Sequence, residues 1–397
     1  MTAIANALSA IVARRDSPGG AAALFTGNQV IWSGASGMRR MPDLPLTIDT
    51  KARIASVSKV ATALVLIQLA AEGKIDLDFD CSPALGFKLR HPSFPDSPIT
   101  PRMILSHTSG VRDADTYRGM VGETLEDFFK VGGKQWSNGA HWAKLDLPLG
   151  HFAYSNLGMG LIAQMAERAT GERFDLLAKR LVFDPLGIDA GFNWSGVPEA
   201  KVAVGATLYR RKKEADSAWE VQVDGDPIAL QRPTTAYEAG KTLADYVIGT
   251  NGLLFAPQGG LRASVMDLVK IGMALTGAAS LLDEATRKAM FAPEWTYRAS
   301  PPNGDTSGGA FQGFGTGVHH LLPGEGCPIR GLKREMVGHY GDAYGLLAGL
   351  WVDSETGSGF AFYLTGSLNS PASGKHSGIY AVEEEMMQAA ANDLGLV

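Results

Sequence analysis

Short runs of strand-forming apolar residues lie near both ends of the chain. Residues 21–25 and 29–34 form one pair of runs, and residues 346–352 and 359–365 form another, each pair separated by a short turn that contains glycine. Two such runs joined by a polar turn are typical of a β-hairpin. We therefore predict one hairpin toward each end of the sequence.

A longer apolar pattern, which Ser56 and Lys59 open, runs to Gly73 and has the spacing of a helix. Val60, Leu64 and Ile67 belong to one broad stripe, and Gly73 stands where a left-handed C-cap is expected. Small residues recur along this stretch, as in a helix that packs on several sides. We predict a buried central helix here. Further helices are predicted over residues 1–15, 101–105, 123–130, 157–168, 173–182, 265–275 and 379–394, and a further hairpin over 202–209 and 219–223.

The order of these elements predicts an α/β (α+β) fold. An antiparallel sheet made from both chain ends is flanked by helices, and a mainly helical region is inserted in the middle. We place residues 1–80 and 250–397 in the sheet-containing domain and residues 81–249 in the inserted region. A cleft between the two parts is the natural place for a ligand, and the predicted central helix would line it.

Composition and charge exclude several classes of protein. The 397 residues are 45% hydrophobic and 19% charged, which is typical of a globular enzyme with a large core. The formal net charge of -5 gives no reason to expect nucleic acid or an anionic membrane as a partner. The one basic run, residues 210–213, is followed by Glu214 and Asp216, so we predict a solvated loop there.

Cysteine and histidine patterns give no sign of a metal or cofactor. Cys81 and Cys327 lack metal-ligand spacing and are expected to be free thiols. His319 and His320 would point to opposite faces of a strand, and no H-E-x-x-H motif occurs. We predict neither a metal ion nor a cofactor.

The first 15 residues lack a basic segment ahead of an apolar core, and the chain has no apolar run of about 18 residues. We expect a cytoplasmic protein, or a periplasmic one if a leader was removed, without a membrane partner. The oligomeric state is left open.

Candidate chemistry begins with Ser56 and Lys59, three residues apart at the start of the predicted central helix. On a helix these side chains share one face, and burial lowers the pKa of an amine so that it can act as a base for a serine hydroxyl. An N-cap serine followed by a snorkelling lysine is the structural alternative. Two further motifs follow in order, Tyr154-Ser155-Asn156 and His339-Tyr340-Gly341.

The three motifs occur together with characteristic local contexts. The chain reads I-A-S-V-S-K at residues 54–59, L-S-H-T-S-G at 105–110, Y-S-N-L-G at 154–158 and P-Q-G-G-L at 257–261. With this set the sequence resembles the penicillin-recognising serine hydrolases, specifically the class C β-lactamase-like branch that contains esterases, D-aminopeptidases and related amidases. The resemblance spans about residues 17–394 and implies a β-lactamase/transpeptidase-like fold.

The resemblance implies a role for each motif residue. Ser56 is expected to be the nucleophile that substrate acylates, and Lys59 to assist its deprotonation. Tyr154 is expected to act as general base and then as acid toward the leaving group, although the identity of the base is disputed in related enzymes. Asn156 is expected to form hydrogen bonds near the lysine and the substrate.

The third motif is expected to form the far wall of the cleft. Gly341 would let the substrate backbone approach closely, and the family pattern places the oxyanion hole at the backbone N–H groups of Ser56 and Asp342. His339 stands where β-lactamases and transpeptidases typically carry the lysine of Lys-Thr-Gly. Because histidine is largely neutral at pH 7, the fixed cation for a β-lactam or peptide carboxylate is missing there.

We therefore predict a serine hydrolase that cleaves an ester or amide bond of a small molecule or short peptide through an acyl-enzyme, most simply a carboxylesterase. A D-aminopeptidase or amidase is the alternative within enzymes, and a penicillin-binding or sensing module without turnover is the alternative outside them. We expect weak β-lactamase activity at most. His107 is predicted to be structural, and the aromatic residues expected to shape specificity are Tyr117, Trp136, Trp142 and Tyr237.

Overall fold

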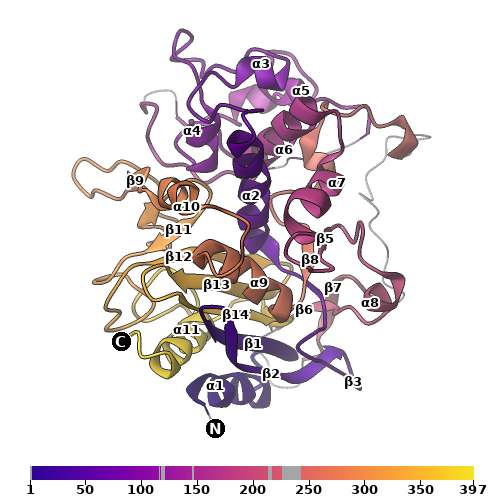
Figure 1. The fold of residues 1–397 in the computed structure, drawn as a ribbon, viewed down its shortest axis with the longest axis vertical. Helices are drawn as coiled ribbons and strands as arrows, with labels where there is room; N and C mark the ends of the chain where they lie inside the picture. Colours follow the sequence, from indigo (N-terminus) through magenta and orange to yellow (C-terminus); the bar gives the residue numbers. More distant parts are fainter. Residues whose placement is uncertain (1, 116, 118–120, 145–146, 213–216, 226–242) are drawn as a thin grey trace.

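The computed structural model describes residues 2–115, 117, 121–144, 147–212, 217–225 and 243–397 (Figure 1). Its centre is a nine-stranded antiparallel sheet in the order β3-β2-β1-β14-β13-β12-β11-β10-β9. Strands from the two chain ends meet in the middle of this sheet, where Ala22 of β1 pairs with Phe362 of β14. The strands are β1 (Gly19–Thr26), β2 (Gln29–Arg40), β3 (Leu44–Pro45), β9 (Trp295–Thr296), β10 (Gly313–Phe314), β11 (His319–Leu321), β12 (Met336–Ala343), β13 (Leu346–Asp353) and β14 (Ser358–Leu364).

Helices cover both faces of the sheet, and the alternation of side chains along each strand explains this arrangement. On β1, Ala21 and Ala23 belong to the core under α9 (Val265–Thr276), whereas Ala22 and Leu24 belong to a second core under α1 (Ala3–Ala13) and α11 (Ala381–Asp393). Successive side chains of a strand point to opposite faces. The central strands are therefore buried on both sides.

The helical region packs on the sheet through α2 (Ser58–Ala71), whose N-terminal end lies next to the sheet and which extends upward from it through the middle of the molecule in Figure 1. Eleven of its fourteen residues are buried, which confirms the predicted central position. The other helices of this half are α3 (Ser82–Leu85), α4 (Pro101–Leu105), α5 (Glu126–Phe129), α6 (Leu157–Thr170), α7 (Phe174–Ala178), continued by a π-helical turn over Lys179–Phe183, and α8 (Glu199–Ala203); α10 (Glu284–Phe291) precedes β9.

The predicted central helix, opened by Ser56 and running to Gly73, begins slightly later than expected. Ala52–Arg53 form strand β4, Ala55–Val57 form a 3-10 turn, and the α-helix begins only at Ser58. The reason is tertiary, because β4 pairs with β8 (Leu261–Ala263) from a distant part of the chain. β8 also pairs with β5 (Gly191–Phe192) in the same small sheet.

The predicted solvated loop at residues 210–213 is wrong for its first two residues. Arg210 and Arg211 lie in β6 (Leu208–Arg211), which pairs with β7 (Glu220–Val223) and runs parallel to β15 (Gly366–Leu368). Arg211 is buried, and its guanidinium donates to the Arg15 carbonyl oxygen. Strand pairing with the C-terminal part of the chain overrides the local charge pattern.

Cys81 and Cys327 are buried free thiols in separate core clusters, as expected.

Within the described part of the chain, no helix is both long enough and apolar enough to span a bilayer.

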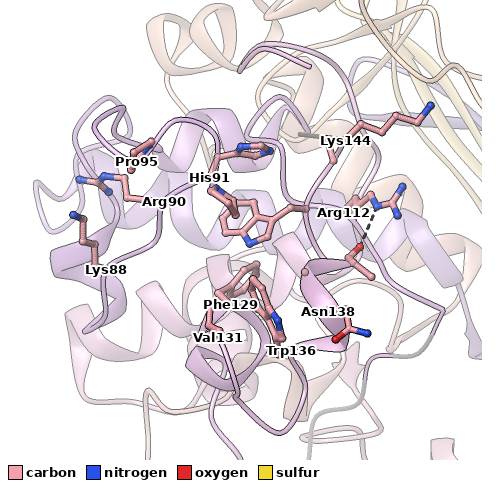
Figure 2. Close-up of a pocket in the computed structure, with 15 residues that line it drawn as sticks. Lys88, Arg90, His91, Pro95, Arg112, Phe129, Val131, Trp136, Asn138 and Lys144 are labelled. Atoms are coloured by element: carbon pink, nitrogen blue, oxygen red, sulfur yellow. Dashed lines mark hydrogen bonds between the residues drawn. The ribbon is translucent and has the colours of Figure 1, made fainter. Parts of the chain in front are cut away.

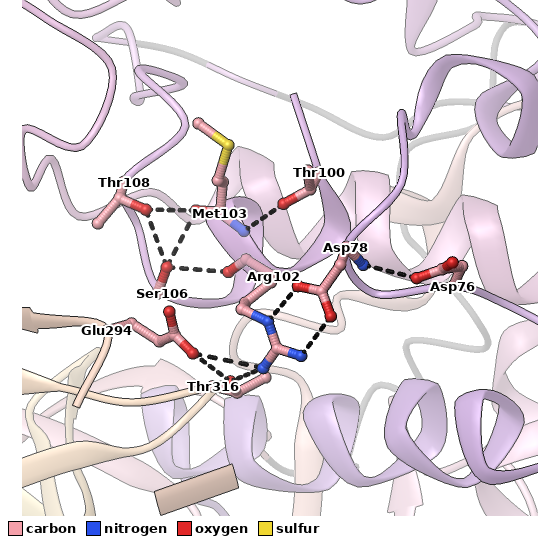
Figure 3. Close-up of polar contacts among 9 residues, drawn as sticks. All are labelled: Asp76, Asp78, Thr100, Arg102, Met103, Ser106, Thr108, Glu294 and Thr316. Carbon is pink, nitrogen blue, oxygen red and sulfur yellow. Dashed lines mark hydrogen bonds and ion pairs between the residues drawn. The ribbon is translucent and has the colours of Figure 1, made fainter. Parts of the chain in front are cut away.

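Arg102 in α4 joins the helical half to the sheet half (Figure 3). Its guanidinium binds both carboxylate oxygens of Asp78 at 2.5 and 2.8 Å, and it reaches Glu294 at 3.3 Å and the Thr316 hydroxyl at 3.0 Å. Glu294 and Thr316 lie next to β9 and β10, whereas Asp78 precedes the helical region. The side chain is partly exposed, so each pair contributes modestly.

We expect Arg102→Ala to lower the free energy of unfolding by about 1–2 kcal/mol, because several partly exposed bonds are lost together. Urea denaturation measures this change. Lys288→Ala is the control, since it removes an exposed pair with Glu284 within one helix and should cost less than about 0.5 kcal/mol. Equal losses in the two variants would contradict the linking role of Arg102.

Candidate active site

The Lys59 amine lies at the meeting point of three segments that are distant in sequence. Its Nζ is 3.0 Å from Ser56 Oγ, 2.7 Å from Asn156 Oδ1 and 2.8 Å from the Gln258 carbonyl oxygen. Ser56 comes from the 3-10 turn before α2, Asn156 from the N-terminal end of α6, and Gln258 from the turn before β8. The helix–sheet arrangement therefore assembles this contact.

The two carbonyl contacts orient the amine. Amide and peptide oxygens only accept hydrogen bonds, so Asn156 Oδ1 and Gln258 O each take one N–H of Lys59. The remaining tetrahedral position faces Ser56 Oγ. In the neutral amine, this position holds the lone pair, so Lys59 can accept the proton of the serine hydroxyl.

Burial tunes the Lys59 amine for this role. The side chain is only 1% exposed, and burial lowers its pKa to about 7, an effect that the negative charge of Asp113 partly offsets. At neutral pH a substantial share of Lys59 is therefore uncharged.

Tyr154 completes the cluster from the side of the helical region. Its ring centroid is 4.8 Å from Lys59 Nζ, and its buried hydroxyl has no hydrogen-bond partner among the described residues. Burial raises the pKa of Tyr154 well above the ordinary value, and the nearby Ser56 hydroxyl, which does not meet the geometry of a hydrogen bond, offsets part of this rise. Tyr154 is thus held as a neutral phenol. Its ring is enclosed by His107 and Phe311, with centroid distances of 4.6 and 4.8 Å.

Asp113 positions Asn156 and was not identified from the sequence. Its carboxylate accepts hydrogen bonds from Asn156 N at 3.0 Å, Asn156 Nδ2 at 2.8 Å and Leu157 N at 2.8 Å. A carboxylate at the first turn of α6 is favoured by the helix dipole and satisfies free N–H groups. Because Nδ2 is held by Asp113, the oxygen of the Asn156 amide points to Lys59.

Strand β12 passes directly over the 3-10 turn at Ser56. A Cβ on Gly341 would lie 2.6 Å from the Ile54 carbonyl oxygen and 3.3 Å from Ser56 N, so only glycine permits this approach. β11 pairs with β12 as far as Gly338, and beyond that point β12 has, among the described residues, a strand partner on one side only, which is β13. Residues 339–343 form an open edge beside Ser56.

A cavity of about 500 Å³ opens at this edge. Its lining includes Ser56, Asn156, Gln258, Gly259 and Asp342. The hydroxyl, the lysine partners and the strand edge thus face one space that is large enough for a small acyl group.

The beta-lactamase family model matches residues 4–380 of the chain. The chain belongs to the beta-lactamase family. The resemblance that the sequence motifs indicate is confirmed at the level of the family, and so is the predicted β-lactamase/transpeptidase-like fold.

Curated relatives match in part. A D-aminopeptidase from Gluconobacter oxydans (strain 621H) is 28% identical over 190 residues, which is 46% of this chain and 34% of that protein. D-alanyl-D-alanine-carboxypeptidase/endopeptidase AmpH from Escherichia coli (strain K12) is 26% identical over 171 residues, 43% of this chain and 44% of that protein. The matched segments span less than half the length of these relatives.

The fold has solved counterparts over the whole length. D-amino acid amidase from Ochrobactrum anthropi SV3, in complex with D-phenylalanine, superposes with a TM-score of 0.68 at 20% identity, covering 99% of this chain and 98% of that one. At this level of identity the likeness shows a shared fold.

In this beta-lactamase-family chain, His339 does not reach the Ser56 cavity. It is fully buried, its Nδ1 donates to the Tyr340 carbonyl oxygen at 2.5 Å, and burial lowers its pKa well below the ordinary value. It is absent from the residues that line the cavity, and its ring centroid lies 6.0 Å from that of Tyr154, so this geometry does not support the substrate contact predicted for His339. A neutral imidazole at this position provides no cation.

The other histidines named from the sequence have packing roles. His107 Nδ1 accepts a hydrogen bond from Ser155 N at 3.2 Å, and its ring supports Tyr154. His319 is buried against aromatic rings, and His320 contacts Glu335. Among the described residues, no three His, Cys, Asp or Glu side chains gather in a way that could hold a metal ion.

The aromatic residues expected to shape specificity separate into two places. Tyr117 lines the Ser56 cavity. Trp136 and Trp142 line a different cavity of about 570 Å³ in the helical region, with Phe129 on its floor and Lys88 at its rim (Figure 2). Tyr237 lies outside the described residues.

We expect the rate of Ser56 acylation to rise as the pH increases through about 7, because the neutral amine of Lys59 accepts the serine proton and the charged amine does not. Stopped-flow acylation by an activated ester between pH 5 and 9 measures the profile. An acylation rate that does not change across this pH range, measured where acylation is rate-limiting, would contradict Lys59 as the base.

Asp113→Asn is expected to move this inflection to lower pH, because the carboxylate favours the charged form of Lys59. The plateau rate should also fall about tenfold or more, since Asn156 loses its orienting partner. Asp96→Asn, on an exposed loop, is the matched control and should leave the inflection in place. An upward shift in Asp113→Asn would show that another group sets the profile.

Proposed function

We propose that this chain is a serine hydrolase that cleaves an ester or amide bond through an acyl-enzyme on Ser56. The observation that carries the proposal is the buried Lys59 amine, which two carbonyl oxygens hold with its third position 3.0 Å from Ser56 Oγ. A serine hydroxyl is a weak nucleophile unless a neighbouring base takes its proton. This arrangement supplies that base.

In the acylation step, Ser56 Oγ bonds to the substrate carbonyl carbon while its proton passes to Lys59 Nζ. The carbonyl oxygen gains the negative charge and is received by the backbone N–H groups of Ser56 and Asp342, which flank the close approach at Gly341. In other hydrolases, the loss of one such donor costs about 3–4 kcal/mol of barrier.

In the collapse step, the bond to the leaving group breaks and the leaving oxygen or nitrogen takes a proton. The raised pKa of Tyr154 keeps its phenol protonated, and its ring lies 4.8 Å from Lys59 Nζ, so Tyr154 is suited to donate this proton and to recover one from Lys59. Water then repeats the sequence on the acyl-enzyme and releases Ser56. Lys59 is the base in this scheme, and Tyr154 is the acid.

A carboxylesterase-like activity on small esters is the first assignment. Hydrolysis of D-amino acid amides or short peptides is the second, and it is supported by the D-aminopeptidase and AmpH relatives. β-Lactamase activity is expected to be weak at most, because the buried neutral His339 offers no cation at the third-motif position.

Ser56→Ala should abolish labelling by a fluorophosphonate probe, because the acyl-enzyme is not formed. It should also lower the turnover of p-nitrophenyl esters by at least about a thousandfold. Labelling followed by intact-mass spectrometry, together with a panel of esters, D- and L-amino acid amides and β-lactams, measures both. Ser354→Ala, in an exposed turn, is the control and should label normally.

Normal labelling of Ser56→Ala would contradict the assignment of the nucleophile. The same experiment separates an enzyme from a sensing module. A transient adduct on wild-type protein indicates turnover, whereas a persistent adduct with every ester and amide in the panel would contradict hydrolysis.

A further inference from the structure

Among the described residues, Arg53 is a buried cation beside the nucleophile with no hydrogen-bond or ion-pair partner. It is the last residue of β4, it is only 9% exposed, and its side chain lines the same 500 Å³ cavity as Ser56. Its Nε is buried without a hydrogen-bond partner. Among the described residues, no side chain or backbone group forms a hydrogen bond or ion pair with the Arg53 guanidinium.

An isolated buried cation is costly, because burial removes its hydration. Here the cost is increased by repulsion from Arg262, and the two effects lower the pKa of Arg53 to about 10, which still leaves it charged at neutral pH. The nearby carboxylate of Asp224 does not compensate fully, because it already accepts two bonds from Arg262, at 3.1 and 3.2 Å. Arg53 therefore retains unused donor groups.

Tyr344 holds the Arg53 side chain in place. The Arg53 Cζ lies 4.7 Å from the Tyr344 ring centroid, a distance typical of a cation–π contact. Tyr344 is in the left-handed region at φ +55 in the turn between β12 and β13, a conformation that is unfavourable for a bulky residue. This turn begins two residues after Asp342, so it links the Arg53 contact to the proposed oxyanion site.

The cavity offers no other cation among its lining residues that the structure describes. Of the two carboxylates that line it, Asp342 lies 3.8 Å from Arg210, and Asp115 is exposed and unpaired with Arg53. A planar guanidinium with free donors matches a carboxylate, which it can bind through two parallel hydrogen bonds.

We propose that Arg53 binds a carboxylate of the substrate, so that the cavity selects esters or amides that carry an anionic group close to the scissile carbonyl. This inference rests on the proposed function and adds a substrate class to it. Arg53 lines the cavity, whereas His339 is neutral and does not line it, so Arg53 would supply the charge that His339 lacks.

Two pairs of substrates test the selectivity. p-Nitrophenyl hydrogen glutarate and its methyl ester differ by a carboxylate on the acyl side, and 3-acetoxybenzoate and 3-acetoxybenzamide differ by a carboxylate on the leaving side. The wild-type chain should hydrolyse the anionic member of at least one pair with the higher kcat/KM. Absence of such a preference in both pairs would overturn the proposal.

In Arg53→Gln, the ratio of kcat/KM for the anionic substrate to that for the neutral substrate should fall at least tenfold, mainly through a higher KM. In Arg53→Lys this ratio should fall less, because lysine keeps the positive charge but cannot form the bidentate hydrogen bonds. Arg298→Gln removes an exposed arginine and is the matched control, with the ratio unchanged. An unchanged ratio in Arg53→Gln, with turnover that still depends on Ser56, would overturn the carboxylate site and leave the proposed function intact.

A stability measurement separates binding from a structural role. Because Arg53 is unpaired, Arg53→Gln should keep or raise the Tm, and added glutarate should raise the Tm of wild-type protein more than that of the variant. A lower Tm with unchanged selectivity would assign Arg53 a structural role and overturn the proposal. If Arg53→Gln does not fold, the substrate preference of the wild-type chain and the kcat/KM ratio of Arg53→Lys test the carboxylate site instead.

Discussion

The removal of the Lys59 amine from water is the constraint on which the site depends. An exposed lysine remains charged at neutral pH, whereas this amine, enclosed between α2, α6 and the turn at Gln258, has a pKa of about 7. Two carbonyl oxygens decide its orientation. Enclosure therefore provides both the reactivity of the base and its direction toward Ser56, and it requires that the sheet and the helical region be packed together tightly.

Each half of the molecule contributes an incomplete set of groups. The helical half supplies Tyr154 and Asn156, with Asp113 setting the amide of Asn156 at the start of α6. The sheet half supplies the strand edge at Gly341, whose missing side chain lets β12 approach Ser56. The chemistry we propose is therefore sensitive to any change that separates the two halves, including changes at the Arg102 network far from the nucleophile.

The surroundings of Ser56 contain features that are unfavourable for stability alone. Within the described part of the chain, Arg53 is a buried charge without a counter-ion and the Tyr154 hydroxyl is buried without a hydrogen-bond partner, and Tyr344 has left-handed backbone geometry. Such features are retained where a ligand or a reaction uses them. Their concentration around one serine is consistent with a site whose polar groups are completed by substrate.

The sequence by itself determined the parts that depend on neighbouring residues. The hairpins at the two ends, the helix over α9 and the spacing of Ser56 and Lys59 follow from local periodicity and motif order, which are properties of short segments. Tertiary structure decided the rest. The contact between Lys59 and Gln258 joins residues 199 positions apart, and Asp113 binds Asn156, which lies 43 positions further along the chain. Arg210 and Arg211 belong to a strand because β15 pairs with that strand. Such partners leave no periodic signal in the chain, because only packing of the two halves brings them together.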